Sequence, residues 1–190
     1  MIIFVAGLLL FLGVHSTRIF AEGWRGATIA RIGERPWKGI YSVLSIASFV
    51  LLVWGYGQAR GQMPLWDPPA VMRYVTVILM LPVFVLFVAA YVPRNAIKAK
   101  LHHPQALSVK LWAFAHLLSN GNLADVLLFG GFLAWAILGF TAARKRDRAV
   151  GTVYPPGTAQ GTLVCVVVGL AIYAAFIMGL HRWLIGVPPI

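Results

Sequence analysis

The sequence predicts an all-α membrane protein, a single domain over residues 1–190 that forms a bundle of six membrane-spanning helices. Hydrophobic residues make up 60% of the chain and charged residues only 11%, and the mean hydropathy is +0.82. The apolar residues fall into long runs separated by short basic or turn-forming segments. A soluble domain of this size needs more polar surface, so these runs are predicted to cross a lipid bilayer.

The six predicted spans differ in length. They lie at about 2–20, 38–57, 72–92, 104–119, 122–142 and 161–183. The fourth span is short, and we expect it to form a hairpin with the fifth. Asn120-Gly121 can end one helix with a left-handed residue, and Asn122 followed by Asp125 resembles a capping pair that begins the next. For Asp125, a capping role and a hydrogen bond that orients a histidine are both open.

The distribution of basic residues predicts the orientation in the membrane. Of the 16 Lys and Arg, thirteen lie in the three connections 15–39, 93–110 and 141–160. Basic connections stay on the cytoplasmic side, so both termini are predicted to be periplasmic. A net charge of +11 suggests nucleic acid in a soluble protein. Here the charge lies between apolar runs, which indicates contact with lipid and no nucleic acid.

Common catalytic signatures are absent. The chain has no phosphate-binding glycine loop, no Gly-x-Ser-x-Gly, no His-Glu-x-x-His and no pair of intramembrane carboxylates. Its one cysteine, Cys165, cannot form an internal disulfide. These absences argue against hydrolysis and phosphoryl transfer.

Two histidines, His15 and His116, lie inside predicted spans, where ionisable side chains are costly and usually mark a functional site. Helical side chains lean toward the N-terminus of their own helix, and the first and fourth spans run in opposite directions. Both imidazoles are therefore expected to point to the middle of the membrane. At helical spacing, His116 has Trp112, Ala113 and Asn120 as neighbours, which is a suitable wall for a flat ligand.

Two facing imidazoles without thiolates or carboxylates suit zinc, copper or iron, but a bare metal site usually takes more than two protein ligands. Haem supplies four ligands of its own. We therefore predict a haem b with His15 and His116 as axial ligands.

Other residues complete this predicted site. Phe11 and Leu12, with Trp112, provide apolar walls, and Arg18 lies three residues beyond His15, where it can meet a propionate. His103 and His181 each lie near one membrane face and are alternative ligands.

Four segments carry a resemblance to a known family: GLLLFLGVHSTRIF, ERPWKGIYSVLSIASFVLLVWGY, HHPQALSVKLWAFAHLLSNGNLADVLLFGG and HRWLIGV. They resemble the NnrU family of bacterial membrane proteins, related to plant and cyanobacterial zeta-carotene isomerase, and we expect the chain to lie in the bacterial inner membrane. The resemblance implies a haem b held by histidines, and the matching motif positions are His15 and His116. The isomerase has a cysteine three residues before the second histidine, where this chain has Ala113. NnrU relatives are named for a link to nitrogen-oxide respiration in denitrifying bacteria.

Three functions are consistent with these features. The first is haem-assisted cis–trans isomerisation of a small hydrophobic substrate such as a polyene. The second is a haem or nitric-oxide-related sensor or maturation factor that acts on a partner without catalysis. The third is a structural membrane subunit or small-solute carrier that binds no cofactor.

Overall fold

The computed structural model describes residues 1–190, and its regular structure is entirely helical. The elements are α1 (Ile2–His15), α2 (Thr17–Phe20), α3 (Glu22–Ile32), α4 (Glu34–Ala59), α5 (Val71–Tyr91), α6 (Ala96–Leu101), α7 (Pro104–Ser119), α8 (Leu123–Val150), α9 (Ala159–Ala175), the π-helical turn η1 (Phe176–Leu180) and α10 (His181–Ile185). This confirms the all-α prediction.

Four helical segments are long and apolar enough to cross a membrane: α4, α5, α8 and the run from α9 through α10. The protein is therefore a membrane protein. Two other apolar helices are shorter, with 14 residues in α1 and 16 in α7. The helix that the sequence predicts over 2–20 ends at His15, and the four-residue α2 follows after Ser16.

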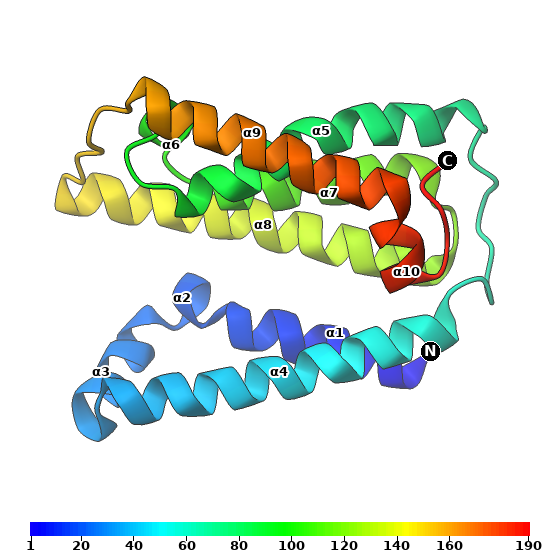
Figure 1. The fold of residues 1–190 in the computed structure, drawn as a ribbon. Coiled ribbons are helices and arrows are strands. Elements are labelled where there is room, and N and C mark those ends of the chain that lie inside the picture. The colour runs from blue at the N-terminus through cyan, green and yellow to red at the C-terminus, as the bar shows by residue number, and fades with distance from the viewer.

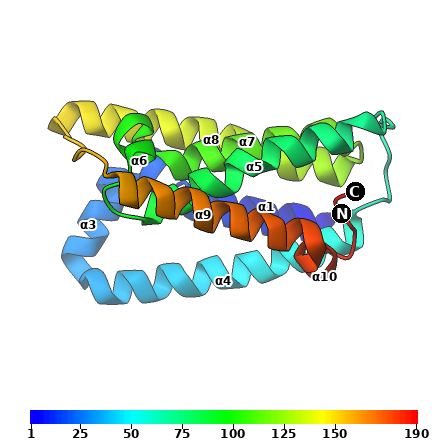
Figure 2. The same cartoon turned by 45° about the horizontal axis from the view of Figure 1, so that its top comes forward.

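The helices form two layers (Figure 1). One layer is the pair α1 and α4, which pack against each other along their length. In the other layer α5 packs against α7 and α9, and α7 packs against α8. The α1 helix also meets α8, so these two helices join the layers. Both termini lie near the same end of the molecule (Figure 1, Figure 2).

Two glycines let α1 and α4 approach closely. A Cβ atom added to Gly7 would lie 2.6 Å from the backbone nitrogen of Leu52, and one added to Gly55 would lie 2.5 Å from the backbone nitrogen of Phe4. The contact is reciprocal, because each glycine faces the backbone of the partner helix. Phe4, Leu8 and Leu52 are buried around it. Small residues are the usual means of close helix packing in membranes.

The turn between α7 and α8 corrects one expectation. Asn120 is extended, with φ −132° and ψ 126°, so no left-handed residue ends α7. Gly121 serves another purpose, because the loop before α5 crosses directly over it, and a Cβ there would collide with the carbonyl of Trp66. The backbone N–H of Leu65 donates to the Gly121 carbonyl at 2.8 Å. The glycine is required by a chain segment far away in sequence.

The capping role of Asp125 is confirmed. Asn122 and Asp125 form a capping box at the start of α8. The other carboxylate oxygen, Oδ1, accepts a hydrogen bond of 2.6 Å from the hydroxyl of Tyr56 on α4. Asp125 thus joins the two layers, and no histidine donates a hydrogen bond to it.

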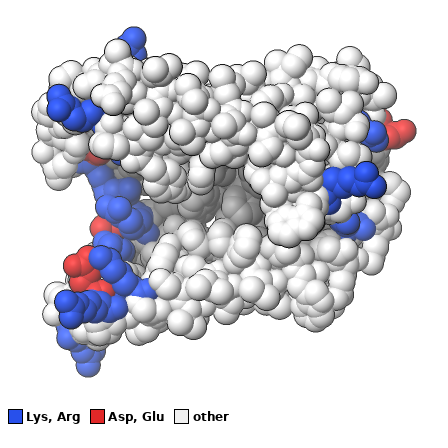
Figure 3. All heavy atoms as spheres, in the orientation of Figure 1, with Lys and Arg blue, Asp and Glu red and all other residues white.

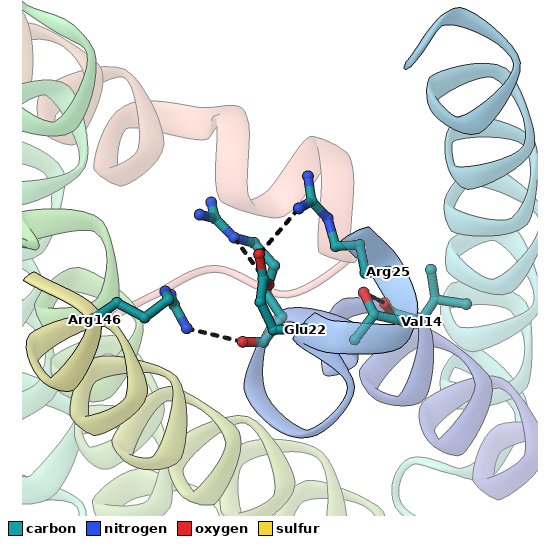
Figure 4. Close-up of polar contacts among 6 residues, drawn as sticks. Val14, Glu22, Arg25 and Arg146 are labelled. Carbon is teal, nitrogen blue, oxygen red and sulfur yellow. Dashed lines mark hydrogen bonds and ion pairs between the residues drawn. The ribbon is translucent and has the colours of Figure 1, made fainter. Parts of the chain in front are cut away.

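Charged residues gather at the end of the molecule that holds α3 and the C-terminal end of α8 (Figure 1, Figure 3). Glu22 lies 3.1 Å from the guanidinium of Arg25 and 3.6 Å from that of Arg18. Arg146 of α8 donates to the Arg18 carbonyl at 2.8 Å (Figure 4). The hydrogen bond from Arg146 links the two layers at this end, and Figure 3 shows that the surface is hollowed between the layers farther along.

Candidate functional site

His15 is the last residue of α1 and lies where α1, α4 and α8 meet. Its Nδ1 donates to the Phe11 carbonyl at 2.7 Å. Its ring lies 4.1 Å from that of Phe11, 5.6 Å from that of Tyr41 and 6.4 Å from that of Trp135, measured between centroids. The carbonyl can only accept, so the neutral ring carries its proton on Nδ1. The Nε2 lone pair is left without a hydrogen bond.

His116 of α7 repeats this arrangement. Its Nδ1 donates to the Trp112 carbonyl at 2.9 Å, again one helical turn earlier. The imidazole stacks on Phe129 of α8 at 4.7 Å and lies 5.4 Å from the ring of Trp112. Its Nε2 also has no hydrogen-bond partner. A hydrogen bond at one ring nitrogen fixes the tautomer in which the other can bind a metal.

Aromatic rings connect the two histidines, which do not contact each other. Phe132 of α8 lies 5.7 Å from Phe11 beside His15 and 5.5 Å from Trp112 beside His116. Along α8, His15 lies opposite Trp135 and His116 opposite Phe129. Six residues separate these two positions, which is a rise of roughly 9 Å. The space between the imidazoles is apolar and aromatic.

Two buried polar atoms near His15 lack hydrogen bonds. They are Nε1 of Trp135 on α8 and Oγ of Ser45 on α4. Ser45 lies one helical turn from Tyr41, whose ring is beside His15. A buried donor without a partner costs about 1–3 kcal/mol, so it calls for an acceptor that the protein alone does not supply. The three-residue spacing of Ser42, Ser45 and Ser48 signals a polar side of α4, but no pattern in the sequence singles out Trp135.

Three other residues of the predicted site, Leu12, Ala113 and Arg18, make contacts of their own within the protein. Leu12 packs on α8, where its Cδ1 lies 3.3 Å from the Cβ position of Gly131. Ala113 is completely buried, so its small side chain serves helix packing. The Arg18 side chain is exposed and pairs with Glu22.

The two alternative histidines lie at opposite ends of the molecule. His181 of α10 lines a cavity together with His116 and Asn120. Its Nδ1 donates to the Val187 carbonyl at 2.7 Å, so its Nε2 is free as well. His103 differs, because its Nε2 lies 2.7 Å from the Asp147 carboxylate and is already occupied. The structure thus places His181, and not His103, near His116.

Tyr154 contacts the same Asp147 carboxylate as His103, and it makes the stability of the protein depend on pH. Its hydroxyl donates to the Asp147 carboxylate at 2.8 Å, and burial together with this hydrogen bond raises the pKa of Tyr154 to about 12. A raised pKa contributes stability that is fully present below the ordinary pKa of about 10 and is lost as the pH rises through 12. We expect the unfolding temperature of wild-type protein to fall more steeply between pH 10 and 12 than that of Tyr154→Phe, measured by thermal unfolding in detergent.

A matched control for this prediction is Tyr74→Phe, which removes an exposed hydroxyl without a hydrogen-bond partner. This variant should follow the wild-type pH profile. Parallel profiles for wild type and Tyr154→Phe would show that the hydrogen bond to Asp147 contributes nothing to stability.

The fold and site define a helical integral membrane protein with two histidines packed among aromatic side chains. No group of three or more His, Cys, Asp or Glu side chains comes together as a metal site. The sequence matches the family described as NnrU protein over residues 3–189. The chain belongs to the NnrU family. No curated protein and no solved structure matches it.

Proposed function

We propose that this NnrU protein is an integral membrane haem-b protein and that His15 and His116 are the axial ligands. The proposal rests on one observation: each of the two histidines makes the same kind of hydrogen bond within its own helix. In each, Nδ1 is held by the carbonyl one turn earlier and Nε2 is free. Two such imidazoles on different helices are a suitable donor set for an iron that already has four macrocycle nitrogens.

Three features of the surroundings fit a bound macrocycle. The walls between the histidines are the rings of Phe11, Trp112 and Phe132. The orphaned donors of Trp135 and Ser45 lie on the His15 side, where they would meet acceptors at the edge of a ligand. The surface between the two layers is hollowed (Figure 3).

A bound haem would supply an iron that changes oxidation state. The residues of this chain orient the imidazoles and exclude water. The Phe11 and Trp112 carbonyls hold the rings by their Nδ1 protons, which also makes the opposite nitrogens better donors. The aromatic shell keeps the surroundings apolar and thereby influences the redox potential of a bound iron.

This arrangement favours a haem protein without isomerase activity. With both histidines as ligands, a bound iron would have no position left for a double bond, and Ala113 stands where the resembling isomerase has a cysteine. We therefore propose an accessory role linked to nitrogen-oxide metabolism, in line with the link for which NnrU proteins are named. His181 is the alternative partner of His116, because both histidines line one cavity.

The proposed topology has six spans in the bacterial inner membrane, with both termini periplasmic. In this topology α1 and α7 cross the membrane in addition to the four longer segments. Two observations support it: the termini lie near the same end of the molecule (Figure 1), and the basic residues gather at the opposite end (Figure 3). Such clustering is typical of the cytoplasmic side.

The proposal is tested by the absorption spectrum of protein purified from haem-replete cells. We expect a Soret band that shifts when dithionite is added. Colourless protein would favour the cofactor-free subunit or carrier. Isomerisation of cis-carotenes by haem-loaded membranes would instead assign the protein to the isomerases.

A further inference from the structure

A cavity of about 370 Å³ lies between α5, α7, η1 and the C-terminal tail of residues 186–190. Its volume is within the range of ligand pockets, roughly 300–1,000 Å³. One end is polar and the other is apolar. We propose that this cavity binds a single-chain amphiphile with a carboxylate head, such as a long-chain fatty acid.

The polar end carries unpaired positive charge. Arg73, at the start of α5, forms no ion pair, and none of the fifteen lining residues is Asp or Glu. His181 also lines the cavity, but its Nδ1 proton is donated to Val187, so the Nε2 of the neutral ring can only accept a hydrogen bond and does not bind the carboxylate. Asp67 lines a neighbouring recess that Arg73 also borders, but it forms no ion pair with this arginine. A guanidinium without a protein partner is a suitable site for a carboxylate.

The inner end of the cavity is apolar. It is lined by Val77, Met80 and Phe84 of α5 and by Phe176 and Ile177 of η1, and the rings of Phe84 and Phe176 meet at 4.9 Å between centroids and close it. A π-helical turn of this kind often occurs at functional sites. Burying an alkyl chain against such a surface is favourable, at about 0.8 kcal/mol per CH₂ group.

The polar side chains of the inner wall already donate hydrogen bonds to backbone carbonyls of the protein. The hydroxyl of Thr76 donates to the Ala115 carbonyl at 2.7 Å, and that of Tyr173 donates to the Val77 carbonyl at 3.1 Å. The inner wall therefore offers no free hydroxyl donor to a ligand. A hydrocarbon chain fits this wall, whereas a sugar or nucleotide would lose hydrogen bonds to water without replacement.

The size and charge of the cavity select among lipids. One alkyl chain fits the apolar part, whereas a two-chain phospholipid needs a larger space. A neutral polyene or alcohol leaves Arg73 without a partner. The tail forms one wall through Val187, Pro188 and Pro189, and the hydrogen bond from His181 to Val187 holds it there.

The fatty-acid site does not depend on the proposed haem. His15 does not line the cavity, and the head group is assigned to Arg73. His15→Ala protein should therefore still bind the amphiphile. Labelling of this variant, with no Soret band, would show the two proposals to be separate.

The experiment is photolabelling with a palmitic acid analogue that carries a diazirine on its chain. Wild-type protein in phosphatidylcholine nanodiscs is irradiated, and the labelled peptides are mapped by mass spectrometry. We expect label on the peptides that contain Met80 and Phe84 of α5 and Phe176 of η1. Unlabelled palmitate should compete for this label, and hexadecanol should not.

Arg73→Gln should reduce this labelling about tenfold, the loss expected for one charge-assisted hydrogen bond. Arg182→Gln, the matched control, removes another arginine at the same end that does not line the cavity. It should label as wild type does. Equal labelling of Arg73→Gln, equal competition by hexadecanol, or label spread over all lipid-facing helices would each overturn the proposal. Thermal unfolding confirms that the variants are folded.

Discussion

Replacing His15 or His116 with alanine is expected to lower haem affinity at least roughly 100-fold. The reason is that each substitution removes a direct ligand, whereas loss of a group that only orients a ligand costs roughly 10–100-fold in metal affinity. Any haem that remains should be five-coordinate and high-spin. The measurement is the absorption spectrum of each purified variant, oxidised and reduced, with the haem-to-protein ratio.

His102→Ala is the control for these two variants. His102 lies outside the aromatic site and stacks on Tyr154 at 4.3 Å. Its replacement should leave the spectrum unchanged. If His181→Ala loses haem and His15→Ala does not, His181 is the partner of His116. Identical spectra for all of these variants would place the ligands elsewhere.

Gly7→Ala and Gly55→Ala are each expected to destabilise the protein by about 2 kcal/mol or more. The added methyl group would lie 2.6 Å or less from backbone atoms of the facing helix, which cannot move aside as a flexible side chain can. The α1 and α4 helices would have to separate, and Phe4 and Leu52 would lose contact area. The free energy of unfolding by denaturant titration in detergent measures this effect.

Matched controls exist on the same two helices. Gly13 of α1 and Gly57 of α4 have no atoms within 4 Å of the added Cβ position. Because alanine favours a helix by up to about 1 kcal/mol over glycine, Gly13→Ala and Gly57→Ala should be neutral or stabilising. Equal effects at all four glycines would show that close packing of α1 and α4 is not important for stability.

The local features of this chain were predictable from the sequence. The apolar runs predicted an all-helical membrane protein, and the spacing of Asn122 and Asp125 predicted the capping box. Both depend on residues that are close in the chain, where helical spacing alone decides which groups meet. His116 was also recognisable, because an imidazole within an apolar run is uncommon.

The features that depend on distant segments were not predictable. Gly121 was expected to end a helix, but the crossing loop at Trp66 is what leaves no room for a side chain there. The unpartnered Nε1 of Trp135 appears only when three helices pack, since a single tryptophan in an apolar run gives no signal. The cavity shared by His116 and His181 needs the π-helical turn that redirects the chain after α9.

The loop between α4 and α5 is the only covalent connection between the two layers. The hydrogen bonds that hold this loop determine how the layers can separate. Main-chain hydrogen bonds from Leu65 and Leu123 attach this loop to the α7–α8 turn, close to both termini. At the opposite end the layers are joined by side-chain contacts, because Arg146 donates to the Arg18 carbonyl and Ile19 of α2 packs on Gly139 of α8. Separation should therefore begin at the arginine-rich end, with the loop as a hinge. A large cofactor would be inserted through that opening, at the end where the basic residues gather (Figure 3).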